Sequence, residues 1–242
     1  VGSAELDAAR QPEVYHRYML GLYDVLERIM SAFPDVLFEG CSGGGGRFDA
    51  GMMHYFNQYW TSDDSDATER MYIQYGTSMV MPSAFMAAHV SAVPNHQVNR
   101  TTPLETRGYV AMGGQLGYEL DVTKMSDDEL SEVKQQIEEY KSVRDIVHNG
   151  ELYRTVSPFE TNNCSWVYAK EDKSAAVLFY FTIANSPSRL PKRVTFRGLD
   201  PNGAYRLRGD DKVYSGDVLM NYGTEIQHNR DCDGTMFVAE RV

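Results

Sequence analysis

The apolar residues change their spacing close to Gly150, and this change most constrains how the chain can fold. Downstream, short apolar runs are separated by turn sequences, which is typical of antiparallel strands. The runs at 165–169 and 175–183 flank the charged turn 170–173 and predict a hairpin. Further strands are expected at 194–196, 204–208, 218–222 and 236–239, with turns at 200–203 and 231–234. Residues 151–242 therefore predict an antiparallel β domain.

Upstream of Gly150, helices are expected to alternate with short strands. Helical spacing of apolar residues predicts a helix from Pro12 to just before Pro34, carried by Val14, Tyr18, Leu22, Val25 and Ile29. A capping box at 126–129 begins another helix, which ends before Asn149. Between them we expect a helical turn at 48–56, a helix at 67–79, an ordered loop at 91–106 and four strands, at 36–38, 58–61, 84–90 and 109–122. Parallel βα units explain this order best, although a closed barrel needs eight strands.

Polar residues begin abruptly where the first two of these strands end. Glu39 follows the first strand and leads into four successive glycines at 43–46, which can adopt positive φ and approach a ligand closely. The second strand ends in an acidic segment at 62–66. Barrels of alternating strands and helices build their sites at such strand ends. We therefore interpret residues 39–67 as the wall of an active site.

The acidic segment offers Asp63, Asp64 and Asp66 as candidate catalytic carboxyl groups. Their spacing does not decide among them. Asp66 stands just before a predicted helix, where a side chain that caps the helix is the simplest explanation. The same explanation and a catalytic one are equally open for Asp64.

Several motifs resemble the α-galactosidases of glycoside hydrolase family 36. They are CSGGGGRFD at 41–49, WTSDDSDA at 60–67, IQYGTS at 73–78, HVSAVPNHQ at 89–97 and RGY at 107–109. The resemblance covers nearly the whole chain. It implies an α/β fold in which the second half of a (β/α)8 TIM barrel, residues 1–150, is followed by an antiparallel β-sandwich, residues 151–242. In full-length family members an N-terminal β domain and the first barrel strands come before this part, so we expect the chain to start after the fourth barrel strand.

The resemblance also implies a retaining α-galactosidase that hydrolyses terminal α-galactosyl residues of raffinose- and melibiose-type oligosaccharides. Asp63 matches the family's acid/base, which is the first Asp of its Trp-x-Ser-Asp-Asp pattern. The loop that lines the family's galactose pocket is matched by Cys41, Ser42, Gly43 and Gly44. Galactose-containing oligosaccharides are thus the expected partners.

The family's nucleophile motif, Lys-Trp-Asp, has no counterpart here, because Trp60 and Trp166 are the only tryptophans and belong to other segments. Glu39 is a poor substitute, since a Glu at this place in the family lacks that role. We therefore expect the chain to carry the acid/base half of the site and to be inactive alone. Two alternatives remain: a non-catalytic carbohydrate-binding or assembly fragment, and an α-N-acetylgalactosaminidase, against which Cys41 favours galactose.

Taken without the resemblance, four residues near the site have simple structural explanations. Cys41 at a strand end is more often a packed residue than a functional one. His89 and His96 are expected to be hydrogen-bonded structural histidines. Arg47 is expected to form an ion pair with Asp49.

Composition narrows the possible partners and cofactors. The net charge of −11 argues against a nucleic-acid surface, and we interpret the basic cluster at 189–197 as a solvated strand edge. The three cysteines suggest neither a disulfide framework nor a zinc site, and we expect no metal and no cofactor. No apolar run is long enough for a membrane span, and no secretion signal is apparent. The missing signal does not decide the location, because the N-terminus resembles the middle of a longer protein; the expected location is cytoplasmic. Because related bacterial enzymes are often tetramers, a homo-oligomer is expected.

Overall fold

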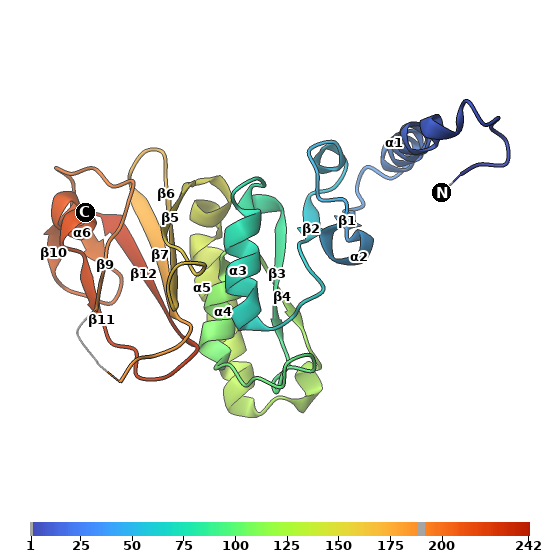
Figure 1. The fold of residues 1–242 in the computed structure, drawn as a ribbon. Helices are drawn as coiled ribbons and strands as arrows, with labels where there is room; N and C mark the ends of the chain where they lie inside the picture. The colour runs from blue at the N-terminus through green and yellow to red at the C-terminus, as the bar shows by residue number, and fades with distance from the viewer. Residues whose placement is uncertain (1, 188–191) are drawn as a thin grey trace.

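The computed structural model of the protein describes residues 2–187 and 192–242. Its first sheet has four parallel strands, as the parallel βα units expected from the sequence imply, and their order is β1-β2-β3-β4. The strands are β1 (Glu39–Gly40), β2 (Gln58–Trp60), β3 (Met86–Ser91) and β4 (Gln115–Glu119). Three helices, α3 (Ala67–Thr77), α4 (Leu104–Met112) and α5 (Asp127–Asn149), form a layer between this sheet and the second one (Figure 1). The part of the chain up to Asn149 is thus a parallel α/β unit.

Alternation along β3 decides which side chains meet the helices. Ala88 and Val90 pack in one cluster with Leu104 and Ala111 of α4 and Val133 of α5. Successive side chains of a strand point to opposite faces of the sheet. His89 and its neighbours at 87 and 91 therefore face away from the helix layer.

The second sheet has six antiparallel strands in the order β10-β9-β12-β7-β6-β5. These strands are β5 (Glu151–Val156), β6 (Asn163–Ala169), β7 (Ala175–Thr182), β9 (Ala204–Leu207), β10 (Val213–Ser215) and β12 (Asp233–Arg241). On one face, Trp166 and Phe179 pack with Val143 and Val147 of α5. On the other face, residues of β6 and β7 pack with the small sheet of β8 (Lys192–Val194) and β11 (Thr224–Ile226) and with α6 (Gly216–Asn221). The partial barrel followed by an antiparallel β domain is confirmed.

The N-terminal helix α1 (Val14–Ala32) follows a short 3-10 turn, η1 (Gln11–Glu13), and extends away from the body of the molecule (Figure 1). Leu26 is its only buried residue, and Leu22 and Leu26 contact the cluster around Tyr59. Other apolar residues that carry the helical spacing are exposed, namely Tyr18, Val25 and Ile29. The helix is where the sequence predicts it, but most of its apolar face is in solvent.

Four predicted strands differ from the structure, and of the one at 194–196 only Val194 lies in a strand, at the end of β8. The run at 36–38 is not a strand, and β1 starts directly after it, at Glu39. Leu37 is 84% exposed, whereas Gly40 packs against the ring of Tyr59. The strand predicted at 109–122 begins as helix α4, and only 115–119 is strand. The strand predicted at 218–222 is helix α6, whose start is capped by Ser215, which accepts from the Val218 N–H. Strands β5, β10 and β11 were not predicted.

Several local predictions are confirmed. The capping box of α5 is present: Ser126 Oγ accepts from the Glu129 N–H, and Glu129 accepts from the Ser126 N–H at 2.9 Å. The hairpin turn at 170–173 is closed by a hydrogen bond from the Lys173 N–H to the Lys170 carbonyl.

Of the basic cluster at 189–197, residues 189–191 lie outside the described residues. None of the helices in the described part of the chain is both long and apolar enough to cross a membrane.

Candidate active site

The glycine-rich segment forms a left-handed turn at the carboxyl end of β1. It is α2 (Ser42–Gly45), in which φ is 54° at Ser42, 67° at Gly43, 71° at Gly44 and 94° at Gly45. The Gly45 N–H closes the turn on the carbonyl of Cys41 at 2.8 Å. Left-handed backbone is costly for residues with a side chain, so the glycines make this turn possible. The prediction of positive φ is confirmed for Gly43, Gly44 and Gly45.

This turn lies directly against Asp63. A methyl group placed on Gly44 would come within 2.7 Å of the Asp63 backbone nitrogen and 3.2 Å of its Oδ1. At Gly43 the same group would meet no atom within 4 Å apart from its chain neighbours. Asp63, Cys41 and Ser42 are all exposed. The structure thus brings the two predicted segments together at one edge of the parallel sheet.

Among the three acidic candidates, only Asp63 has a carboxylate without a hydrogen bond from another described residue. Asp64 Oδ1 accepts from the Asp66 N–H at 2.9 Å. Asp66 is buried, accepts from the Glu69 N–H at 3.0 Å and forms an ion pair with Arg100. The capping role predicted for Asp66 is confirmed. The carboxylates of Asp64 and Asp66 therefore stabilise the local backbone, whereas the carboxylate of Asp63 can interact with a ligand.

A buried arginine that was not singled out in the sequence fixes the backbone around Asp63. Arg70 of α3 is 1% exposed, and its guanidinium donates to the carbonyls of Ser62 and Asp64 at 3.4 and 3.3 Å. It also donates to the Ala87 carbonyl of β3 at 2.7 Å. Burial lowers the pKa of Arg70 to about 10, so the group remains a cation near neutral pH. Arg70 lies with Met71 and Gln74 on the buried face of α3, but its partners are distant in the sequence, so no local pattern pointed to this role.

A second set of contacts comes from the last residue of β3 and from the loop that follows it. The Gln97 side chain donates to the Asp63 carbonyl at 3.0 Å and accepts from the Ser65 N–H at 2.9 Å. Asn95 donates to Ser65 Oγ at 3.0 Å, and Ser91 Oγ donates to the Ser65 carbonyl at 2.6 Å. The acidic segment is thus held from both sides.

On the face of β3 away from the helices, His89 is buried between Trp60 and Glu119. The two rings lie 4.7 Å apart, and His89 Nε2 lies 3.1 Å from Glu119 Oε2. Burial, and then the charge of Arg70, lower the pKa of His89 to about 4, so its imidazole is neutral at neutral pH. His89 is buried and packed, but neither of its ring nitrogens has a hydrogen-bond partner in the described chain, so the hydrogen bonds predicted for it are not found. His96, by contrast, is exposed and makes none of the described hydrogen bonds.

Two further expectations near the site were tested. Arg47 does not pair with Asp49; it donates to the Tyr18 hydroxyl and lies over that ring, 5.2 Å from the centroid. Asp49 instead accepts from the Met52 N–H at 3.0 Å, starting η2 (Met52–His54). Glu39 accepts from Gln58 Nε2 at 2.6 Å. Both carboxylates therefore have local structural partners.

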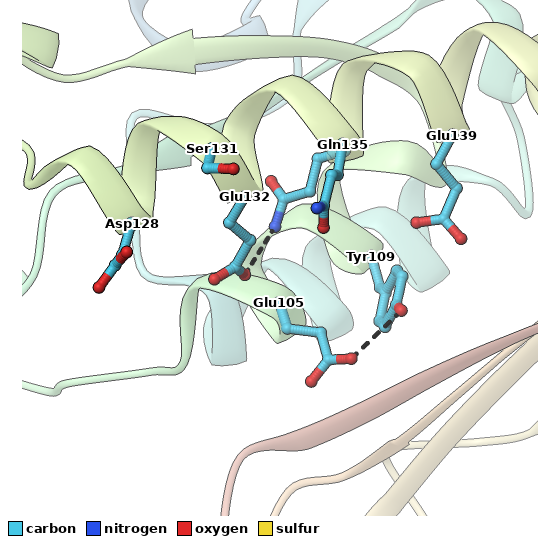
Figure 2. A pocket seen from close by; sticks show the side chains of 8 residues that line it. Glu105, Tyr109, Asp128, Ser131, Glu132, Gln135 and Glu139 are labelled. Atoms are coloured by element: carbon cyan, nitrogen blue, oxygen red, sulfur yellow. Dashed lines mark hydrogen bonds between the residues drawn. The ribbon is translucent and has the colours of Figure 1, made fainter.

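A cavity of about 420 Å³ lies between α4 and α5 and is lined by Glu105, Tyr109, Asp128, Ser131, Glu132, Gln135, Gln136 and Glu139 (Figure 2). All of these residues belong to the two helices, whereas Asp63 follows β2. Burial, followed by the charge of Glu105, raises the pKa of Glu132. Within the described residues no group of three or more His, Cys, Asp or Glu could hold a metal ion, here or at Asp63. The cavity is a separate acidic feature of the helix layer.

Family models match both parts of the chain. The model described as Melibiase matches residues 1–150, and the one described as the glycosyl hydrolase family 36 C-terminal domain matches residues 163–238. The chain is 50% identical over 228 residues to alpha-galactosidase AgaA of Geobacillus stearothermophilus, covering 94% of this chain and 31% of AgaA. It is 47% identical over 220 residues to alpha-galactosidase Mel36A of Lactobacillus acidophilus, covering 91% of this chain and 30% of Mel36A.

Solved structures agree with these matches. The structure of an AgaA variant in complex with raffinose has a TM-score of 0.96 and 48% identity, covering all of this chain and 34% of that one. The alpha-galactosidase from Lactobacillus brevis has a TM-score of 0.95 and 45% identity, covering 99% of this chain and 34% of that one. The chain thus spans about a third of the length of the relatives it matches.

Proposed function

This chain belongs to glycoside hydrolase family 36, and from that membership we propose that it supplies the acid/base side of a retaining α-galactosidase site. The observation that carries the proposal is the contact between the Gly44 backbone and Asp63 at the carboxyl ends of β1 and β2. A carboxyl group that receives no hydrogen bond from the described residues thus lies beside a turn in which three of the four residues are glycine. A sugar can approach such a surface closely.

Asp63 is proposed as the acid/base. Retaining glycosidases use two carboxyl groups about 5 to 5.5 Å apart, one that protonates the leaving oxygen and one that attacks the anomeric carbon. Asp63, protonated, would give its proton to the departing oxygen as the glycosidic bond breaks. As a carboxylate, it would then take a proton from the water that hydrolyses the covalent intermediate. The attacking carboxyl group would come from another part of a full-length enzyme.

We propose that Cys41, Ser42, Gly43 and Gly44 line the galactose pocket. Cys41 and Ser42 are exposed at the same edge as Asp63, which supports this role. The substrates would be terminal α-galactosides of the raffinose and melibiose type. Raffinose is the ligand in one of the similar structures, where it is bound to a variant of AgaA.

The substrate proposal is tested with a full-length enzyme that carries this chain, either its natural form or a chimera with the preceding part of the Geobacillus stearothermophilus relative. We expect hydrolysis of raffinose and melibiose, and a higher kcat/KM on an aryl α-galactoside than on the matched α-N-acetylgalactosaminide. A preference for the α-N-acetylgalactosaminide would show that the enzyme is an α-N-acetylgalactosaminidase. Sugar binding without turnover by the properly folded full-length enzyme would support a non-catalytic carbohydrate-binding protein.

A pair of glycine variants tests the proposed pocket. Gly43 and Gly44 have nearly the same φ, so replacement by Ala should cost similar backbone strain, about 1 to 2 kcal/mol, at either position. Only at Gly44 does the new methyl group collide with Asp63. We therefore expect Gly44→Ala to lower kcat/KM far more than Gly43→Ala in the full-length enzyme, and to lose more thermal stability as well, because its methyl group meets the Asp63 backbone. Equal activity losses would show that the contact with Asp63 has no part in catalysis.

A further inference from the structure

The loop after β3 reaches across to the segment that carries Asp63 through the amide of Gln97. Gln97 Oε1 accepts from the Ser65 N–H at 2.9 Å and lies 3.2 Å from Ser65 Oγ, while Nε2 donates to the Asp63 carbonyl at 3.0 Å. A backbone N–H can only donate and a backbone carbonyl can only accept. The orientation of the amide is therefore fixed by its partners, and neither an acid nor an apolar side chain can reproduce both contacts.

Gln97 is itself held in place by Asn95. The Asn95 side chain is 3% exposed; its Oδ1 accepts from the N–H groups of Gln97 and Val98 at 2.9 and 3.1 Å. Its Nδ2 donates to Ser65 Oγ at 3.0 Å. The backbone of Gln97 is thus already held next to the acidic segment by Asn95. Less conformational entropy is therefore lost when the long side chain of Gln97 is fixed there.

Gln97 holds a part of the backbone that Arg70 does not reach. Arg70 binds the carbonyls of Ser62 and Asp64, on either side of Asp63. Gln97 binds the carbonyl of Asp63 itself and the N–H of Ser65. The carboxylate of Asp63 receives no hydrogen bond from the described residues, so its direction depends on this backbone.

We propose that Gln97 is a positioning residue that sets the direction of the Asp63 carboxyl group, an inference that rests on the acid/base role proposed for Asp63. Proton transfer is sensitive to placement, and a shift of about 1 Å at a catalytic group can cost about 100-fold in rate. Loss of the Gln97 contacts therefore impairs the transfer of the proton to the leaving group. It leaves the glycine turn, and with it sugar binding, unchanged.

Two variants in the full-length enzyme test this role. Gln97→Met keeps the length of the side chain and removes both contacts, and Gln97→Glu can still accept from Ser65 but cannot donate to Asp63. We expect both to lower kcat on raffinose by about 10- to 100-fold with KM nearly unchanged. The loss on an aryl α-galactoside with a good leaving group should be much smaller, since that substrate needs less help from an acid. Gln135→Met, at an exposed position of α5, is the matched control and should behave as the unaltered enzyme.

A double-mutant cycle separates this role from a general structural one. If Gln97 acts through Asp63, Gln97→Met should have almost no further effect on raffinose turnover once Asp63 is Ala. An undiminished further loss, or equal losses on both substrates, would overturn the inference. If Asp63→Ala itself showed no dependence on the leaving group, the acid/base assignment would fail instead. If Gln97→Met does not fold, the double-mutant cycle of Gln97→Glu with Asp63→Ala tests in the same way whether Gln97 acts through Asp63.

Discussion

Asp63→Ala in a full-length enzyme carrying this chain is expected to lower kcat/KM on raffinose by about 10²- to 10⁴-fold, the usual contribution of a general acid. An aryl α-galactoside should lose much less in its first step, because its leaving group departs without a proton. Azide, which needs no general base, should then restore turnover of the aryl substrate by attacking the covalent intermediate. The measurement is kcat/KM on both substrates, with and without azide.

The neighbouring carboxyl group provides the control for this experiment. Asp64 Oδ1 already accepts a backbone N–H, so Asp64→Ala should lower both activities by similar, smaller factors and show no azide rescue. The reverse pattern, with selective loss and rescue at Asp64, would move the acid/base role to that residue.

The chain alone is expected to show no measurable hydrolysis of an aryl α-galactoside. A retaining mechanism needs a nucleophile that forms a covalent intermediate, and no Lys-Trp-Asp motif is present in the sequence. The carboxylates near Asp63 are already engaged: Glu39 with Gln58, Asp64 with the Asp66 N–H, and Asp66 with Arg100.

This expectation is checked by assaying the purified chain, its intact mass confirmed, beside a version extended by the preceding part of a family member. Activity should appear only in the extended protein. Robust turnover by the chain alone would mean that one of its own carboxyl groups serves as the nucleophile, and Glu39 would be the first to replace.

The parallel unit could be predicted from the sequence where local signals and apolar spacing agree. The capping box of α5 and the positive φ values of the glycine turn depend on a few neighbouring residues, and both predictions are confirmed. Where the signal is only apolar character, prediction fails. The apolar run at 109–112 predicts a strand, but these residues complete helix α4, where Val110, Ala111 and Met112 are buried between the two sheets; a short buried apolar run fits either structure.

The partners of the site were harder to predict than its candidate residues. Asp63 and the glycine turn were identified from motifs, and their proximity followed from adjacent parallel strands. The roles of Arg70 and Gln97 depend on contacts with residues 6 to 34 positions away, which no local pattern reveals. The expected Arg47–Asp49 pair was wrong for a related reason: sequence proximity predicted it, and the ring of Tyr18 on a distant helix provides the actual partner.

The residues that contact each other around Asp63 are close in the sequence, and this affects the order in which the chain folds. Gln97 is 34 residues from Asp63, and Arg70 is 17 residues from Ala87, whereas the contact between Thr68 and Cys232 spans 164 residues. The entropic free-energy cost of closing a 164-residue loop is about 1.4 kcal/mol higher than that of closing a 34-residue loop. Contacts between residues close in sequence also tend to form faster. We therefore expect the contacts among residues 61–100 around Asp63 to form before β12 joins the sheet.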